Sequence, residues 1–106
     1  MILVYITNPS CEQARTLAKH LIEKRLIACA NIYSGVTSLY RWKGTLAEES
    51  ECVMIGKTQE ALFDSVRQEV ERVHPYEIPC ILKIPVSANE AFLNWLEGEV
   101  SQETGL

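Results

Sequence analysis

Hydrophobic and polar positions follow two different periods along this chain, and the change of period marks the expected elements. Runs rich in β-branched and aromatic residues are typical of strands and cover residues 1–7, 28–42, 45–58 and 80–86. Apolar positions three and four residues apart predict helices, which cover residues 11–24, residues 58–74 and the stretch after residue 87. The first strand and residues 52–55 are apolar without alternation, so we expect both of their faces to be buried. The polar tail, residues 101–106, is expected to fray.

Local signals predict where the helices begin and end. Ser10 and Ser87 each stand three residues before a glutamine or glutamate, the spacing of a capping box, so we expect both serines to cap helices. Thr58 is expected to cap the second helix and Pro75 to end it, because a proline disfavours helical backbone in the preceding residue. His20 falls between the apolar positions of the first helix and is expected to be solvated.

The order strand, helix, strand, strand, helix, strand is the split βαβ arrangement, here followed by one more helix. It predicts an α+β fold of the ferredoxin-like type. We expect a four-stranded antiparallel sheet with helices on one face, a long hairpin formed by the second and third strands, and an extra C-terminal helix. The chain contains no repeat, linker or low-complexity segment, so residues 1–106 are expected to form a single domain.

The hairpin over residues 28–58 is longer than the rest of the domain can cover. At about 3.3 Å per residue, each arm would span about 45 Å, whereas a domain of this length is about 26 Å across. Alternatively, Ser34-Gly35 breaks the first arm, since a glycine inside a strand often marks a bulge or bend. A lone two-stranded ribbon is only marginally stable in water. We therefore expect the outer half, with Tyr40 and Trp42, to lie against a neighbouring subunit.

Composition and cysteine usage limit the possible partners and the compartment. The net charge of −4 argues against nucleic acid, because phosphate binding normally needs a basic patch. The N-terminal apolar run is too short for a signal-peptide core or a membrane span, so a cytoplasmic protein without membrane contact is expected. Cysteines stand far apart at positions 11, 29, 52 and 80, which predicts reduced thiols.

Candidate metal ligands gather around residues 74–79, His-Pro-Tyr-Glu-Ile-Pro, where two prolines stiffen a segment that displays imidazole, phenol and carboxylate. Imidazole and carboxylate suit a borderline cation such as copper or zinc, and a thiolate from Cys29 or Cys80 would add a soft ligand. The spacing of His74 and Glu77 is not a recognised metal motif. The alternative is a helix stop with a hydrogen-bonded histidine.

The register of the hairpin decides which polar groups share one of its faces. If Lys43-Gly44 is a two-residue turn, Ala30 lies opposite Lys57 and Val36 opposite Glu51. Alternation then places five side chains of the second arm on one face: Glu49, Glu51, Val53, Ile55 and Lys57. The charged members of this set line either a polar groove or a solvated strand edge.

Two known functions of this fold match the sequence poorly. An RNA-recognition domain stacks bases on aromatic residues of its central strands, but residues 52–57 contain no aromatic side chain. An acylphosphatase-like enzyme would need a glycine-rich anion cradle with an arginine near the first strand, and residues 7–10 supply neither. No nucleophile stands beside a base and an orienting group, so we expect a protein that is not an enzyme.

Five stretches occur in an order that is typical of one family. They are residues 23–31 (EKRLIACAN), 38–44 (SLYRWKG), 49–51 (ESE), 57–58 (KT) and 74–79 (HPYEIP). With the closing residues 92–96 (FLNWL), the chain resembles the CutA-type divalent-cation tolerance proteins over nearly its whole length. The resemblance implies a homotrimer similar to the PII signalling proteins, in which the long strands contact neighbouring subunits. It implies a link to copper and other divalent metals and no organic cofactor.

Two functions follow from the resemblance and the residues together. The first is a cytosolic trimer that confers metal tolerance by binding metal ions, copper above all, through Cys29, His74 and Glu77. The second is a PII-like signalling module that holds a small anionic metabolite between subunits and acts on a partner protein. The inter-subunit clefts would be lined by Trp42, Glu49, Glu51, Lys57 and Tyr76.

Cys80 departs from the family pattern, which usually has an acidic residue after the second proline of the His-Pro-Tyr turn. If that carboxylate helped to shape an ion site, the site in this chain would be softer. The alternative is that Cys80 is a small core residue at the start of a strand.

Overall fold

The computed structural model describes residues 1–100 of the chain, so the expected fraying of residues 101–106 lies outside the described part. The elements are β1 (Ile2–Asn8), α1 (Cys11–Glu23), β2 (Cys29–Trp42), β3 (Thr45–Thr58), the 3₁₀ turn η1 (Glu60–Leu62), α2 (Phe63–Val73), β4 (Ile81–Pro85) and α3 (Glu90–Glu99). The strands form one antiparallel sheet in the order β2-β3-β1-β4. This confirms the predicted α+β fold, with its long hairpin and its extra C-terminal helix.

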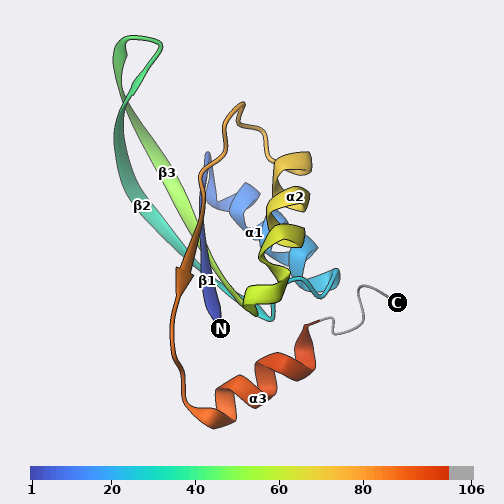
Figure 1. The fold of residues 1–106 in the computed structure, drawn as a ribbon. Coiled ribbons are helices and arrows are strands. Elements are labelled where there is room, and N and C mark those ends of the chain that lie inside the picture. The colour runs from blue at the N-terminus through green and yellow to red at the C-terminus, as the bar shows by residue number, and fades with distance from the viewer. Residues whose placement is uncertain (101–106) are drawn as a thin grey trace.

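Helices α1 and α2 lie side by side on one face of the sheet (Figure 1). Ile2, Val4 and Ile6 of β1 point toward them and are fully buried, as are Leu21 of α1 and Val66 of α2. Helix α3 lies instead across the end of the sheet where β1 begins (Figure 1). The main core is therefore a single layer between the sheet and two helices.

The other face of the sheet is not covered by any helix of the described chain. Leu3 and Tyr5, which alternate with the buried positions of β1, are only half-buried. Leu82 and Ile84, their partners on β4, are 48% and 39% exposed. The prediction that β1 is buried on both faces is therefore wrong for a single chain. The continuous apolar run does reflect two apolar faces, but only one of them has a helix layer.

The hairpin of β2 and β3 extends well beyond the helices (Figure 1), and the molecule measures 45 × 29 × 23 Å. Each strand has 14 residues, so the long-arm prediction is confirmed. Trp42 pairs with Thr45, and the two turn residues between them, Lys43 and Gly44, have φ angles of 51° and 84°. Positive φ at both central residues is the geometry of a type I′ turn, which matches the right-handed twist of the strands.

A β-bulge interrupts the register at Ser34-Gly35, where Gly35 has a φ angle of 74°. Beyond it Val36 lies opposite Glu51, as predicted. On the inner side the register has moved by one residue, so Lys57 pairs with Cys29 and not with Ala30. The glycine thus marks a bulge within one long strand and does not divide the strand into two.

Ser10 caps α1 as predicted, with its hydroxyl oxygen accepting a hydrogen bond from the backbone nitrogen of Gln13 at 3.1 Å. The next residue, Cys11, forms a disulfide with Cys52 of β3, across a sequence separation of 41 residues and a Cα–Cα distance of 5.2 Å. The prediction of four reduced thiols is therefore wrong. The spacing along the chain gave no signal because the packing of α1 on the sheet brings these two cysteines together.

The predicted caps of the other two helices are wrong. Thr58 is fully buried, and its hydroxyl donates to the carbonyl oxygen of Leu26 at 2.7 Å, so it ties β3 to the loop before β2. The chain then enters α2 through η1. Helix α3 begins at Glu90 after Asn89, two residues beyond Ser87. In each case a residue with capping chemistry is placed by the tertiary structure outside the capping position.

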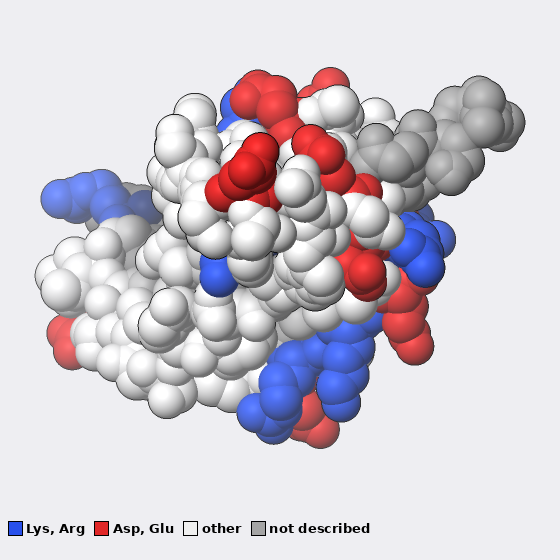
Figure 2. All heavy atoms as spheres, turned by 90° about the horizontal axis from the view of Figure 1, so that it is seen from below, with Lys and Arg blue, Asp and Glu red and all other residues white. Residues whose placement is uncertain are grey.

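Charged side chains are dispersed over the end of the molecule where α3 lies (Figure 2). Basic side chains appear at several separate places in this view, the larger groups with acidic side chains beside them, and most of the visible surface carries neither (Figure 2). None of the helices in residues 1–100 is long and apolar enough to cross a membrane.

Candidate functional site

His74 is held at the point where α2 ends. The helix stops at Val73 and the backbone of His74 is extended, as expected for a residue before a proline. Its Nε2 lies 2.9 Å from the carbonyl oxygen of Thr7 and donates to it, while Nδ1 accepts a hydrogen bond from the backbone nitrogen of Tyr76 at 3.1 Å. Burial lowers the pKa of His74, which fits a neutral ring with both nitrogens occupied.

Tyr76 joins the loop after α2 to the middle of β3, because its hydroxyl donates to the carboxylate of Glu51. Burial, and then the Glu51 carboxylate, raise the pKa of Tyr76 well above its usual range, so the phenol remains a donor. Its ring meets the His74 ring edge to face, with centroids 4.7 Å apart. Burial and Glu51 also raise the pKa of the Cys80 thiol. We call these four residues, Glu51, His74, Tyr76 and Cys80, the Glu51–Tyr76 cluster.

The predicted metal ligands are not brought together within one chain. Cys29 pairs with Lys57, which also pairs with Leu3, whereas His74 is bonded to Thr7 at the other end of β1. Leu3 and Thr7 are four residues apart along β1, a distance of about 13 Å. Among residues 1–100, no group of three or more histidine, cysteine, aspartate or glutamate side chains could hold a metal ion. The set of Cys29, His74 and Glu77 stays a prediction that needs donors from a second chain.

The predicted cleft residues are also spread along the molecule. Trp42 stands at the hairpin turn with the ammonium of Lys43 5.7 Å from its ring centroid. Lys57 lies at the other end of β3, about 40 Å away along the strand, with its ammonium 5.6 Å from the ring centroid of Phe92. Glu49 is exposed on the outer hairpin. One chain therefore brings together Glu51 and Tyr76 of this set, with the charge of Glu49 also acting on Tyr76.

Most of the large exposed apolar side chains lie on the hairpin and on the uncovered face of the sheet. The predicted interface residues Tyr40 and Trp42 are 43% and 40% exposed. Other large exposed apolar residues on these elements and on the loop before β4 are Tyr33, Leu39, Leu46, Ile78, Leu82 and Ile84. A surface of this extent on a small protein is typical of an interface with another chain.

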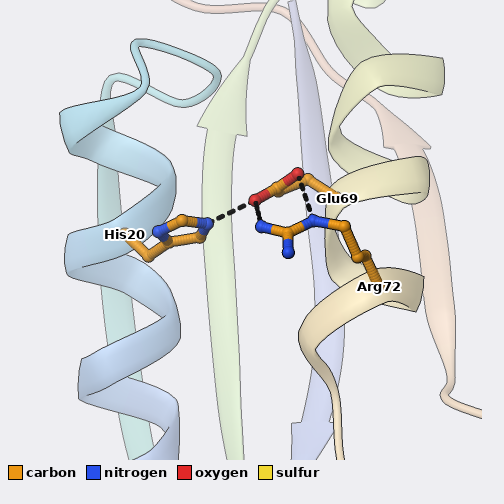
Figure 3. A network of polar contacts seen from close by, with 3 residues as sticks. All are labelled: His20, Glu69 and Arg72. Carbon is orange, nitrogen blue, oxygen red and sulfur yellow. Dashed lines mark hydrogen bonds and ion pairs between the residues drawn. The ribbon is translucent and has the colours of Figure 1, made fainter.

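One polar network was missed at the sequence level. His20 was expected to be solvated, but its Nε2 is bonded to the carboxylate of Glu69, which joins α1 to α2 (Figure 3). Arg72 binds the same carboxylate with two nitrogens, at 3.2 Å and 2.6 Å. These contacts, Arg72 first, lower the pKa of Glu69 to about 2. The i, i+3 spacing of Glu69 and Arg72 could have indicated their pair, but the contact with His20 depends on helix packing.

A sequence model of the CutA1 divalent ion tolerance protein family matches residues 2–99 of the chain. The chain belongs to this family. It is 44% identical over 95 residues to the divalent-cation tolerance protein CutA of Thermus thermophilus, covering 89% of this chain and 92% of that protein. The resemblance inferred from the sequence motifs is therefore confirmed.

Solved CutA1 structures have the same fold. A mutant of CutA1 from Pyrococcus horikoshii superimposes with a TM-score of 0.93 at 40% identity, covering 96% of this chain and all of that one. The protein from Archaeoglobus fulgidus, named a periplasmic divalent cation tolerance protein, gives a TM-score of 0.91 at 41% identity and covers 95% of this chain and all of that one. The superpositions extend over nearly the whole chain, so the long hairpin and the C-terminal helix are features shared with these structures.

Proposed function

We propose that this CutA1-family protein acts in divalent-cation tolerance as a cytoplasmic homotrimer that binds metal ions, copper in particular, between its subunits. The observation that carries the proposal is the uncovered sheet face, which continues into the exposed aromatic residues Tyr40 and Trp42 of the hairpin. Closed cyclic assembly would cover this surface on every chain and leave no free edge strand. The CutA names of its relatives support the cellular role.

The metal site is proposed to lie where two chains meet, since residues 1–100 of one chain contain no metal-binding group of three. Cys29 and Cys80 are both free thiols and half-buried, and soft sulfur donors favour copper. Glu77 is exposed and available to a neighbour. Coordination by His74 would replace one of its two hydrogen bonds, to Thr7 or from Tyr76.

A binding role fits the chemistry of the Glu51–Tyr76 cluster better than catalysis does. A reactive cysteine needs a lowered pKa, whereas burial and Glu51 raise the pKa of Cys80. The phenol of Tyr76 is likewise held in its protonated form by Glu51. We therefore propose a non-enzymatic protein without an organic cofactor.

Two measurements test the proposal. Sedimentation equilibrium should give the mass of three chains, and a compact monomer at micromolar concentration would contradict the assembly. Calorimetric titration with copper should show binding that is weakened in Cys29→Ala, His74→Ala and Glu77→Gln. Glu23→Gln, a change at an exposed carboxylate of α1, is the matched control. Heats that are unchanged in all three variants would reject these ligands.

The PII-like alternative can be tested on the same assembled protein. Trp42 and Lys57 are too far apart to share a ligand within one chain, so this function also needs the contact between chains. A small anionic metabolite that shifts Trp42 fluorescence in the absence of added metal would favour signalling over metal binding. A protein partner would then be sought with the ligand present.

A further inference from the structure

A cavity of about 550 Å³ opens between α1 and the end of α2, on the side of the sheet that the helices cover. Thr16 and Leu17 belong to its wall on α1, and Val73 and Pro75 to its wall at the end of α2. Asn8, the last residue of β1, is its most deeply buried lining residue, at 1% exposure. This volume lies within the range of small-molecule sites, about 300–1,000 Å³.

The Asn8 side chain offers this cavity an oxygen that has no donor. Its amide nitrogen donates to the carbonyl oxygens of Ile6 and Cys52, at 3.1 Å and 3.3 Å, and these two bonds fix the orientation of the amide. Within residues 1–100, no group donates to Oδ1, and no side-chain oxygen there is both enclosed and unpaired. Oδ1 therefore has some accessible surface, and since Asn8 lines the cavity, this oxygen is the acceptor that the side chain can offer there.

The charged groups around the cavity favour a cation. Glu12, in the first turn of α1, lines it and forms no ion pair with any described residue. The nearby carboxylate of Glu69 differs because His20 and Arg72 already neutralise it (Figure 3). Neither lysine nor arginine is among the lining residues. The wall thus carries the Glu12 carboxylate without a lysine or arginine beside it, and its uncharged polar side chains, Gln13 and Thr16, can accept as well as donate. These groups share the wall with the apolar side chains of Leu17 and Val73.

A metal ion does not fit this wall. His74 is the only one of the proposed metal ligands among the lining residues, and no cluster of three potential ligands is formed by the described part of the chain. A ligand with donor N–H groups and an apolar body would match both parts of the wall.

We propose that the cavity is a binding site for a small organic cation, a primary amine with an aryl or alkyl body. The ammonium group would lie between the Glu12 carboxylate and Asn8 Oδ1, and the apolar body against Leu17 and Val73. The site lies on the helix-covered side of the sheet, away from the exposed hairpin surface. Its proposed polar contacts, Glu12 and Asn8, belong neither to the proposed metal ligands nor to the proposed subunit interface, so the site can be tested separately from both.

Phenethylamine is a suitable probe, titrated into ¹⁵N-labelled, oxidised protein at neutral pH and followed by backbone amide chemical shifts. Saturable changes are expected at Thr16, Leu17 and Val73. Phenethyl alcohol, which lacks the charge, should bind at least about fivefold more weakly, and 3-phenylpropionate should not bind, because Glu12 repels it. Equal binding of the three compounds, or shifts confined to other parts of the chain, would overturn the proposal.

Two pairs of variants locate the site. Glu12→Gln should weaken phenethylamine binding about three- to tenfold, whereas Glu23→Gln, at an exposed carboxylate in the last turn of α1, should leave it unchanged. Thr16→Phe should fill the cavity from an exposed position and abolish binding. Arg15→Phe, its exposed neighbour outside the lining, should not. Circular dichroism checks the fold of each variant, and undiminished binding in folded Thr16→Phe would refute the site.

Discussion

The hydroxyl of Tyr76 donates to the carboxylate of Glu51 across 25 residues of sequence, and this contact fixes the loop after α2 against β3. Tyr76→Phe should lower the free energy of unfolding by about 1–2 kcal/mol, because a hydrogen bond to a charged group is lost in a half-buried place. Denaturant unfolding measures this effect. Tyr33→Phe is the matched control, since the Tyr33 hydroxyl has no hydrogen bond to the described residues; an equal loss in both variants would contradict the assigned contact.

Acid should weaken the contact between α1 and α2. Arg72 and His20 hold the pKa of Glu69 at about 2, below its ordinary value of 4.5, so the unfolded chain binds this proton first as the pH falls. The stability that comes from ionised Glu69 is present above pH 4.5 and is lost as the pH falls toward 2. In Glu69→Gln, thermal unfolding should depend less steeply on pH over this range. Glu23→Gln should keep the original slope.

Reduction of the disulfide should destabilise the fold. Cys11 and Cys52 close a loop across 41 residues, and the loss of such a crosslink costs about 4 kcal/mol by the chain-entropy relation. Unfolding with and without a dithiol reductant measures the difference. Cys52→Ala should be less stable than the oxidised protein and insensitive to the reductant. Cys29→Ser, a change at a free cysteine, should respond to the reductant as the original chain does.

A charge at the hairpin turn should loosen the proposed trimer. Trp42→Glu replaces an exposed aromatic side chain that would face a neighbouring chain, and the charge would then have to be desolvated. Sedimentation equilibrium should show dissociation at concentrations where the original protein is assembled, while circular dichroism keeps the signal of the folded sheet. Ile22→Glu, at a similarly exposed position of α1, should leave the assembly intact. A trimer of unchanged affinity would remove Trp42 from the interface.

Local features of the fold were predictable from the sequence, and contacts between distant elements were not. The turn at Lys43-Gly44 and the Ser10 cap depend on residues within a few positions of one another, so their chemistry is visible in the linear sequence. Thr58 has the same capping chemistry but is bonded instead to Leu26, which only the folded chain places beside it. The residue type therefore identifies candidate helix caps, and the packing of the chain decides which of them cap a helix.

The candidate site shows the same limit. Residues 74–79 were singled out for their polar side chains and their prolines, but their partners were not predicted: Tyr76 is bonded to Glu51 of β3, and His74 to the end of β1. The disulfide and the contact of His20 with Glu69 were missed for the same reason. All of these pairs join elements whose relative placement has no signature in residue spacing.

The bulge at Ser34-Gly35 determines on which face of the sheet the side chains of the outer half of β2 lie. Odd-numbered positions of β2 face away from the helices before the bulge, as Tyr33 does, and even-numbered positions do so beyond it, as Tyr40 does. If the bulge were lost while both residues stayed in the strand, strict alternation would turn every side chain of the outer arm of β2 to the opposite face. Tyr33 and Tyr40 would then no longer share a surface. The bulge thus takes up one extra residue and keeps the aromatic groups of both halves of the strand on the same surface.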